Sequence, residues 1–534
     1  MTTVISISAL LAMNPASSNE AYVEGYYAAG DLGGGEFYYD SGSSATPNNG
    51  TIFQSTYTGT GRWFRVLNGT RINARWFGVT GNGSTDDTTT LQAAMDYCGS
   101  NGLGLYLSKG IYIVSAVSAG FSLTIRYSGF FMEGDGFESE IKNANSNQYN
   151  SVLMLKANSG QIQNITVRNI HVNGNKANQS GSWNGKCVTI FCINSSSNVL
   201  NITLDGLYCN NGYSDNPTVS GEGGGISIAG NDNFAMNEYY PQNVLITNCF
   251  CWDNTGWGIG TNNANGVIIS NNTCWNNATM GITLWNTQDC VVNGNICYLN
   301  TDYGINMELC DRITTSGNKI YGVSNGCMST YNSVDVVASN NILIRNGDYY
   351  DRANFNIVSG PGYVSGTYKQ RPCSKILVAD NSMTMVGTEG YVVRAIPDSG
   401  YALNHDIVIQ GNTLINNGVN KGIEAHANDV VIADNTVIGR VFVNSGSGEA
   451  IVRNNKISFG NVGSAYMLEV NNCDKVILSA NSLNAVSNGV SAINLNVNPS
   501  TFALVCENTA SGAFSAVATA AYGVIWTNRN NLLF

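Results

Sequence analysis

The sequence has little charge, little proline and almost no histidine. Of its 534 residues, 11% are charged, 8 are proline and 3 are histidine. Lys and Arg number 25 against 36 Asp and Glu, and the net charge of −11 gives no basic footprint for nucleic acid. No run of about 18 apolar residues occurs, as a membrane-spanning helix would require. We therefore expect neither a nucleic-acid partner nor a membrane span.

Targeting signals and metal-binding motifs are also missing. The apolar stretch Val4–Met13 has no basic residue before it and no clear cleavage site, unlike a signal peptide. The 14 cysteines show no C-x-x-C spacing and accompany very few histidines. We therefore predict buried reduced thiols in place of disulfides or a zinc site, and we expect no metal and no cofactor.

The sequence does contain a repeat of 23 residues, which is clearest between Gln242 and Asn346. Four residue pairs recur at this step: Cys251-Trp252, Cys274-Trp275, Cys297-Tyr298 and Ile320-Tyr321. A period of this length without helical spacing is typical of a solenoid, and short runs such as Val244–Ile246 are strand-like. Each repeat is therefore predicted to form one coil of a parallel β-helix, which makes the protein an all-β protein.

The repeat also predicts which side chains face the interior. Strands of successive coils stack about 4.8 Å apart, so equivalent residues become nearest neighbours. The column that begins at Cys251 is predicted to fill the interior, and the column that begins at Trp252 should point outward because side chains alternate along a strand. A column of asparagines is expected at a tight bend, where amides can hydrogen-bond along the stack. Its first members are Asn272, Asn295, Asn318 and Asn341.

We predict four segments along the chain. Residues 1–72 do not follow the coil pattern, and their glycines indicate tight turns between short strands. Residues 73–115 contain a helix, Asp87–Cys98, with apolar residues at helical spacing and an aspartate cap, which would close the open end of the solenoid. The β-helix is expected to occupy residues 116–505, and a short C-terminal β piece is expected over residues 506–534.

Several segments of the N-terminal region resemble the entry region of bacteriophage tailspikes of the pectate-lyase-like β-helix superfamily. These segments are GYYAAGDLGGG, GRWFR and WFGVTGNGSTDDTTTLQAAMDYC, followed by Gly110-Ile111-Tyr112. The resemblance implies a parallel homotrimer of right-handed β-helices that binds and cleaves the capsular or other surface polysaccharide of a bacterium. It makes residues 1–72 a neck or particle-attachment module that joins the phage tail or another receptor-binding protein. The chain would then be made in the host cytoplasm, be carried on the virion and act at the bacterial cell surface.

Cleavage of a glycosidic bond needs two carboxyl groups, about 5–5.5 Å apart for retention or about 6.5–9.5 Å apart for inversion. If Ile305 points inward, alternation along its strand points Glu308 outward. The residues one coil before and one coil after Glu308 are Trp285 and Tyr331. We therefore predict that Glu308 lies between two aromatic side chains and acts in catalysis.

Further candidates lie near the same strand edge. The catalytic candidates besides Glu308 are Asp302, Glu222 and Asp253, and the substrate-binding candidates are Trp257, Trp285, Tyr303 and Tyr331. Glu222 and Asp253 are expected about 8 Å apart. Asp302 and Glu308 would lie about 20 Å apart on a straight strand, so that pair requires a bend. The structural alternative is that the acids are turn residues and that the aromatic rings only stack on one another.

A second outward pair, Glu424 and His426, occupies the same coil position as Glu308. A His or Tyr base beside a charge-neutralising group would suit β-elimination from a uronic acid. The largest insertion, Arg345–Cys373, mixes aromatic and charged residues suited to an anionic sugar chain. We favour hydrolysis, because four acids gather near one strand edge and histidine is scarce. The alternatives are a polysaccharide lyase that acts on a uronic-acid-containing capsule and a non-catalytic glycan-binding tail adhesin.

Overall fold

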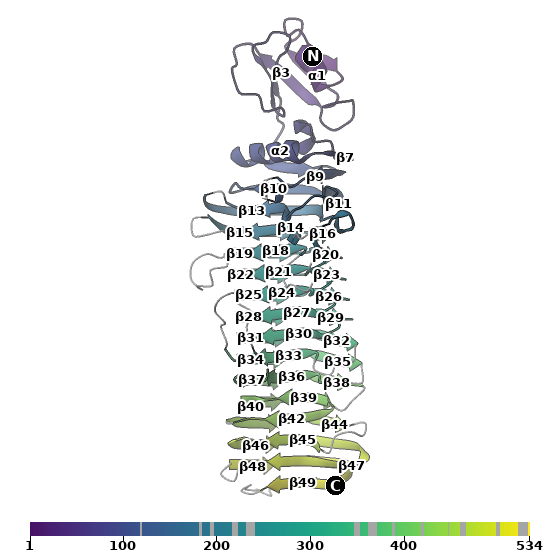
Figure 1. The fold of residues 1–534 in the computed structure, drawn as a ribbon, viewed down its shortest axis with the longest axis vertical. Helices are drawn as coiled ribbons and strands as arrows, with labels where there is room; N and C mark the ends of the chain where they lie inside the picture. Colours follow the sequence, from purple (N-terminus) through teal and green to yellow (C-terminus); the bar gives the residue numbers. More distant parts are fainter. Residues whose placement is uncertain are drawn as a thin grey trace. The chain divides into compact units, whose positions relative to one another are not determined.

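The protein is nearly all β, with parallel strands in most of the chain (Figure 1). The computed structural model describes residues 1–117, 120–157, 159–180, 184–192, 197–215, 223–230, 241–346, 353–360, 371–386, 390–417, 421–446, 448–459, 466–497, 502–521 and 532–533. The chain forms two compact parts, Met1–Gly256 and Trp257–Phe534.

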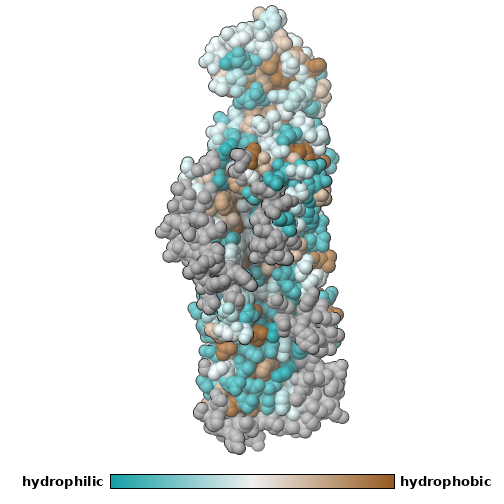
Figure 2. Space-filling view, in the orientation of Figure 1, coloured by the Kyte–Doolittle hydropathy of each residue, from teal (hydrophilic) through white to brown (hydrophobic). Residues whose placement is uncertain are grey.

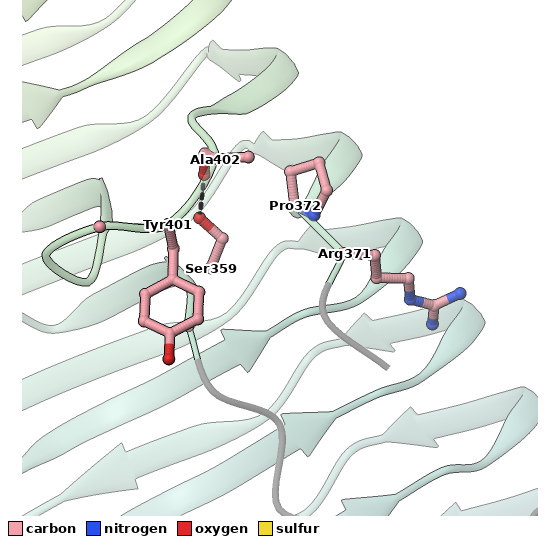
Figure 3. Close-up of a pocket in the computed structure, with 7 residues that line it drawn as sticks. Ser359, Arg371, Pro372, Tyr401 and Ala402 are labelled. Carbon is pink, nitrogen blue, oxygen red and sulfur yellow. Dashed lines mark hydrogen bonds between the residues drawn. The ribbon is translucent and has the colours of Figure 1, made fainter. Parts of the chain in front are cut away.

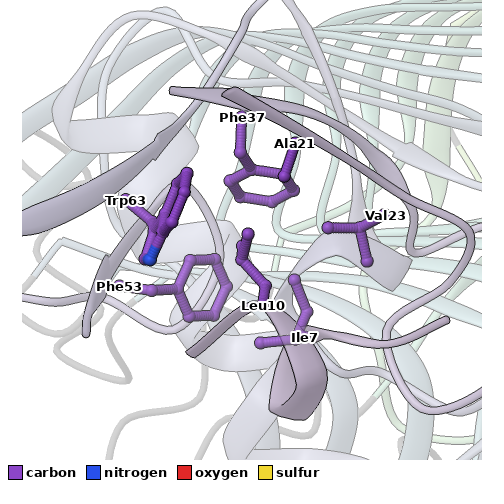
Figure 4. Close-up of a cluster of buried hydrophobic side chains, with 7 residues drawn as sticks. All are labelled: Ile7, Leu10, Ala21, Val23, Phe37, Phe53 and Trp63. Carbon is purple, nitrogen blue, oxygen red and sulfur yellow. The ribbon is translucent and has the colours of Figure 1, made fainter. Parts of the chain in front are cut away.

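A small sheet begins the first part. Its strands, in spatial order, are β1 (Thr2–Val4), β2 (Glu20–Val23), β3 (Gly35–Asp40), β5 (Arg62–Arg65) and β4 (Ile52–Gln54). Helix α1 (Ile7–Ala12) packs on this sheet, and Figure 4 shows the buried side chains that meet between them: Ile7, Leu10, Ala21, Val23, Phe37, Phe53 and Trp63. Arg65 is buried beside this core, where it donates hydrogen bonds to the carbonyls of Gly33, Gly34 and Gly50. Its burial lowers the pKa of the guanidinium to about 9.

The predicted capping helix is present as α2 (Thr88–Ser100). Its predicted apolar face is buried, including Leu91, Met95 and Cys98. The Asp86 carboxylate accepts a hydrogen bond of 2.9 Å from the Thr88 backbone N–H at the start of the helix. Asp87 instead accepts hydrogen bonds from the preceding loop, so the aspartate pair has a structural role. Among the described residues, no helix is long and apolar enough to cross a membrane.

The coil strands of the first part pair in parallel. They are β6 (Arg71–Asn73), β7 (Asn82–Asp86), β8 (Gly104–Leu107), β9 (Gly110–Val114), β10 (Phe121–Ile125), β11 (Phe131–Asn143), β12 (Ser151–Leu155), β13 (Gly160–Asn173), β14 (Asn184–Phe191), β15 (Ser197–Asp205), β16 (Tyr208–Asn210), β18 (Ile226–Ala229), β19 (Gln242–Thr247) and β20 (Phe250–Trp252). A short strand, β17 (Tyr213–Ser214), pairs with β14 in the antiparallel sense. Short 3₁₀ helices lie at Ala74–Phe77 and Lys176–Asn178.

Trp257–Phe534 is built from coils that contribute to three parallel sheets, and its strands follow one another in chain order (Figure 1). Sheet I contains β22 (Asn265–Ser270), β25 (Gln288–Asn293), β28 (Asp311–Ser316), β31 (Val334–Ser339), β34 (Ser374–Ala379), β37 (Asn404–Gln410), β40 (Ala427–Ala433), β43 (Glu449–Arg453), β46 (Lys475–Ser479) and β48 (Phe502–Cys506). Sheet II contains β23 (Thr273–Trp275), β26 (Ile296–Tyr298), β29 (Lys319–Tyr321), β32 (Ile342–Asn346), β35 (Ser382–Val386), β38 (Thr413–Asn416), β41 (Thr436–Ile438), β44 (Lys456–Phe459), β47 (Ser482–Asn496) and β49 (Thr509–Ala521). Sheet III contains β21 (Ile259–Asn262), β24 (Ile282–Trp285), β27 (Tyr303–Glu308), β30 (Gly326–Tyr331), β33 (Phe355–Ser359), β36 (Val393–Pro397), β39 (Lys421–Ala425), β42 (Arg440–Asn444) and β45 (Tyr466–Asn471). The last strand, β50 (Leu532–Leu533), pairs with β49.

The pairing register confirms the 23-residue step. Cys274 pairs with Cys297, which pairs in turn with Ile320, and all three side chains are fully buried. The adjacent outward rings of Trp275 and Tyr298 stack with centroids 5.9 Å apart and an interplanar angle of 2°. All cysteines are free thiols, and all but Cys506 are buried as predicted.

The asparagine column forms a continuous amide ladder in the second part. The Asn272 side-chain amide donates to the Asn295 side-chain oxygen at 3.0 Å, and the same contact links every following pair. The ladder members are Asn272, Asn295, Asn318, Asn341, Asn381, Asn412, Asn435, Asn455, Asn481 and Asn508. This ladder joins sheet I to sheet II at a buried bend and fixes the register of the strands on either side.

The visible surface is mostly polar. Figure 2 shows apolar residues in small scattered groups among hydrophilic residues on the face that it displays. Such single apolar residues are normal on a protein surface. The interior columns, which the view does not show, contain the apolar side chains that pack the coils.

Candidate active site

Sheet III places a carboxyl group between two aromatic side chains. In the register of its strands, Trp285 of β24 pairs with Glu308 of β27, which pairs with Tyr331 of β30. Ile305 and Met307 of β27 are fully buried, whereas Glu308 is only half-buried. The predicted alternation and the predicted neighbours of Glu308 are therefore confirmed.

A second carboxylate, Asp398, contacts this row. The hydroxyl of Tyr331 donates a hydrogen bond of 2.7 Å to Asp398 Oδ2. Asp398 directly follows β36 and is exposed. Gly360 permits this arrangement, because a Cβ atom at this position would lie 1.9 Å from the Tyr331 hydroxyl and 2.3 Å from Asp398 Oδ2. Tyr331 therefore stands between the carboxylate of Asp398 and that of Glu308.

Gly360, which lies against Tyr331 and Asp398, also lines a pocket of about 170 Å³, and Figure 3 shows other residues of its lining. Its lining residues are Ser359, Gly360, Arg371, Pro372, Gly400, Tyr401 and Ala402. The hydroxyl of Ser359 donates a hydrogen bond of 2.5 Å to the Ala402 carbonyl, which holds the two sides of the pocket together. Arg371 is anchored by an ion pair with Asp311 at 2.8 Å and by hydrogen bonds to two backbone carbonyls. The pocket thus has a mixed polar and apolar lining.

The structure does not bring Asp302 and Glu308 together. Strand β27 runs unbroken from Tyr303 to Glu308, so these two acids lie at its opposite ends, about 20 Å apart. The bend that the predicted pair required is absent. The Asp302 carboxylate instead accepts a hydrogen bond of 2.5 Å from the Asn325 side-chain amide.

Two of the four predicted sugar-binding aromatic residues are buried. Tyr303 is only 7% exposed, because β27 begins at this residue and gives it the inward parity of Ile305. Trp257 is 9% exposed, and its indole covers Gly260 so closely that a Cβ atom there would lie 2.2 Å from the ring. The rings of these two residues are therefore not exposed for stacking on a sugar. Trp285 and Tyr331 are half-buried and keep part of their surface accessible.

The other predicted pair is only partly described. Asp253 has a left-handed backbone with φ of 56°, and its carbonyl accepts a hydrogen bond from Lys176 Nζ. Glu222 lies outside the described residues, as does most of the insertion Arg345–Cys373. The proximity of Glu222 and Asp253 therefore stays a prediction.

The predicted pair Glu424 and His426 belongs to an ionic cluster on sheet III. Arg394 Nε contacts Glu424 Oε2 at 2.8 Å, and His426 Nε2 lies 3.4 Å from Glu424 Oε1. Burial by itself raises the pKa of Glu424, but His426 and Arg394 outweigh it and lower the pKa below its usual value. Glu424 is therefore ionised at neutral pH.

The alternation of side chains along a strand could locate only the site residues that lie in regular coils, such as Glu308. Asp398 and Arg394 were missed because the coils around them are irregular in length: the ladder steps from Asn341 to Asn381 and then to Asn412 span 40 and 31 residues.

Among the residues that the structure describes, no group of three or more His, Cys, Asp or Glu side chains is placed to hold a metal ion. The described site offers carboxylates, a tyrosine hydroxyl and aromatic surface, which are groups suited to acid–base chemistry.

Two segments match known protein families. Residues 3–68 match the profile of a phage tail protein small four-stranded β-sheet domain, and residues 190–346 match the profile of a right-handed β-helix region. Two curated relatives are the mannuronan C5-epimerases AlgE1 and AlgE4 of Azotobacter vinelandii, which are 31% identical over 118 residues and 32% identical over 117 residues. Each match covers 21% of this chain, but only 8% of AlgE1 and 21% of AlgE4.

Solved structures of similar fold include an epimerase module and two tailspikes. The A-module of mannuronan C-5 epimerase AlgE4 of Azotobacter vinelandii has a TM-score of 0.51 and 15% identity, with 86% of this chain and 99% of that chain covered. A tailspike protein of E. coli bacteriophage HK620 has a TM-score of 0.53 and 14% identity, with 90% and 84% covered. The Dettilon tailspike protein has a TM-score of 0.53 and 14% identity, with 68% and 66% covered. At these identities the likeness establishes the parallel β-helix fold.

Proposed function

We propose that this chain is a phage tailspike depolymerase that binds a bacterial capsular or other surface polysaccharide and hydrolyses its glycosidic bonds. The observation that carries the proposal is the outward row of Trp285, Glu308 and Tyr331, with Asp398 hydrogen-bonded to Tyr331. Two carboxyl groups beside an aromatic platform suit glycoside cleavage. The phage-tail match of residues 3–68 and the tailspike-like fold support the same assignment.

Each residue of the row has a distinct proposed role. Glu308 donates a proton to the leaving oxygen, and Asp398 activates the attacking water. Tyr331 orients Asp398 through its hydroxyl, and Trp285 stacks on a sugar ring. By strand register, Glu308 and Asp398 lie about three coil steps apart, roughly 14 Å along the sheet, so both side chains must lean toward Tyr331 to reach the separation of about 6.5–9.5 Å that inverting glycosidases use.

The remaining predictions follow the tailspike assignment. Residues 1–72 attach the chain to the phage tail or to another receptor-binding protein, residues 73–115 close the solenoid, residues 116–505 carry the glycan site and residues 506–534 form its end. The protein assembles as a parallel homotrimer on the virion, after synthesis in the host cytoplasm, and acts at the bacterial cell surface. Glu222 and Asp253 stay candidates for catalytic acids.

Two other functions compete with this proposal. The cluster of Arg394, Glu424 and His426 would suit a lyase that neutralises the carboxylate of a uronic acid before β-elimination. A lyase product contains an unsaturated uronate that absorbs ultraviolet light, whereas a hydrolysis product does not. A non-catalytic adhesin would bind polysaccharide without releasing any oligosaccharide.

The deciding experiment combines clearing of lawns with product analysis. Purified protein is spotted on lawns of many encapsulated strains, and capsule from a cleared strain is then digested with wild type and with Glu308→Gln. If the enzyme is a hydrolase, the wild type should produce new reducing ends that do not absorb ultraviolet light. Glu308→Gln should produce no new reducing ends. An absorbing product would establish the lyase, and binding without release would establish the adhesin.

A further inference from the structure

The outer face of sheet I carries an apolar column that the proposed cleavage chemistry does not use. In the strand register, Ile268 pairs with Val291, and the same column continues through the following strands of the sheet. All of its members but Thr314 are aliphatic, and all lie at least partly exposed, with Ile268 44% exposed. We call this column the sheet I stripe, and its members are Ile268, Val291, Thr314, Val337, Leu377, Val408, Val431, Ile451, Ile477 and Leu504.

The stripe has the dimensions of a subunit interface. It extends over nine coil steps, which at about 4.8 Å each make it about 43 Å long. A strand of five residues is about 16 Å long, so sheet I presents a strip of about 700 Å² along the stripe. A stable protein interface buries about 800 Å² on each partner, and exposed apolar patches of a few hundred Å² mark interaction sites. The stripe is therefore large enough to hold a second protein molecule.

Outward columns on the other two sheets differ from the stripe at the same coils. The column of sheet III that faces outward there contains Arg394, Glu424, Phe442 and Glu469. An outward column of sheet II contains Ser382, Thr413, Thr436 and Lys456. The aliphatic character is therefore not a general consequence of the coil repeat, and it distinguishes sheet I from the sheet that carries Glu308.

A hollow interrupts the stripe. A pocket of about 180 Å³ opens between its members Val408, Val431 and Ile451, and its other lining residues are Asp406, Asp429, Val430 and Glu449. Aliphatic walls of this kind fit an aliphatic side chain of a partner, because apolar surfaces gain stability when they leave water together.

Charged side chains border the stripe on the side where the strands begin. Several of them are paired within the chain: Arg312 with Asp289, Lys375 with Asp335, and Lys475 with Glu449. An apolar centre with a polar rim is the arrangement that protein interfaces have. The paired rim also means that a partner need not supply counter-charges there.

We infer that the sheet I stripe is the face through which copies of this chain pack against one another. The inference rests on the proposed function for the number of copies, which is three. Copies related by an axis parallel to the coil stack place equivalent strands at the same height, so each stripe meets its neighbours over its full length. A polysaccharide fits this face poorly, because the stripe has no aromatic ring and its only hydroxyl is that of Thr314.

This assignment has a consequence for the proposed site. Sheet III is a separate face of the coils, and it contains the row of Trp285, Glu308 and Tyr331. With sheet I inside the assembly, this row stays open to polysaccharide on every copy. Each copy therefore carries its own complete site.

Charged substitutions test the stripe through the mass of the assembly. The full chain with Val431→Lys and Ile451→Lys is compared with the wild type by light scattering coupled to size exclusion. The wild type should give three times the chain mass of 56.9 kDa, and the double variant should give one chain mass. Two ammonium groups without partners in the interface should raise the dissociation constant at least about hundredfold. A trimer mass for the folded double variant would overturn the inference.

Ile342→Lys is the matched control, because Ile342 is 45% exposed on sheet II and receives the same charge. It should keep the mass of the wild type. Dissociation of this control would place the contact on sheet II and would overturn the inference. Circular dichroism checks that each variant retains the β-rich spectrum of the wild type.

Cysteine labelling tests the same face without adding charge, and it decides the question if the lysine variants do not fold. Val431→Cys and Ile342→Cys are each treated with a maleimide, and the wild type gives the background because its cysteines other than Cys506 are buried. Val431→Cys should react at least about tenfold more slowly, since it becomes accessible only when the assembly opens. Equal rates would show that the stripe is uncovered and would overturn the inference.

Failure of the proposed function gives a different pattern from failure of this inference. A wild type of one chain mass that still cleaves capsule would keep the depolymerase and reject the inference. A trimer that the stripe variants dissociate, but that cleaves no capsule, would reject the depolymerase and keep the inference.

Discussion

Glu308 is the last residue of β27 and Asp302 directly precedes its first residue, and the two acids have different surroundings. Glu308 lies in register between Trp285 and Tyr331, whereas Asp302 is engaged by the Asn325 amide at the far end of the strand. Alternation along the strand was sufficient to predict the first position. The separation of about 20 Å between the two acids means that single substitutions can distinguish them.

Glu308→Gln should lower the rate of capsule cleavage by a factor of about 10²–10⁴, because general acid catalysis typically contributes this much. Asp302→Asn is the matched comparison and should keep most of the activity. Reducing-end release from capsule measures both rates, and circular dichroism checks that both variants are folded. A normal cleavage rate for Glu308→Gln would show that Glu308 is not the catalytic acid and that the site lies at other residues.

Tyr331→Phe tests the contact between the tyrosine and Asp398. Loss of the 2.7 Å hydrogen bond leaves Asp398 without its orienting donor, so kcat should fall while KM for the capsule changes little. The removed hydroxyl does not affect the ring that borders Glu308. A fall in affinity with an unchanged kcat would instead give Tyr331 a role in sugar binding only.

The lowered pKa of Glu424 gives the folded protein an acid-sensitive contribution to stability. A carboxyl group whose pKa is lower in the folded than in the unfolded state stabilises the fold above the unfolded value of about 4.3. This contribution is lost as the pH falls through the lower, folded pKa. Melting temperatures recorded from pH 7 down to pH 3 should therefore fall less steeply for Glu424→Gln than for wild type. Parallel curves would show that Glu424 contributes no such term.

At the scale of the secondary-structure elements, the asparagine ladder is the main polar support of the bend between sheets I and II. The side chain of Asn295 takes part in four hydrogen bonds, with Asn272, Ile269 and Asn318. Asn295→Ala leaves their buried partners unsatisfied, at a cost of about 1–3 kcal/mol for each group. Hydrogen exchange should become faster in the adjacent coils, since a solenoid unit contacts only its neighbours. Thr314→Ala, at an exposed position of β28, is the control and should leave exchange unchanged.

The regular coils could be predicted from the sequence because equivalent residues share one spacing. The interior column through Cys274 and the outward column through Trp275 both follow from the step of 23 and the alternation of a strand. The burial of Trp257 could not be predicted in this way, because it depends on the ring folding over Gly260. The position of Asp398 depends on a coil of irregular length, where a fixed period carries no information.

At the scale of the whole molecule, the trimer is the assembly that the tailspike assignment implies. Light scattering coupled to size exclusion should give three times the chain mass of 56.9 kDa. A mass of one chain would reject the trimer and leave the coil register unaffected, since every contact of the ladder lies within one chain. Removal of residues 1–72 should abolish attachment to phage particles and should preserve cleavage of isolated capsule.

The ladder tolerates very different lengths of chain between its members. Consecutive asparagines are bonded in the same way whether 20, 23, 31 or 40 residues separate them. Residues added between two ladder members therefore need not disturb the buried amides. Insertions between ladder members can therefore change in length during evolution while the buried amides go on supporting the same fold.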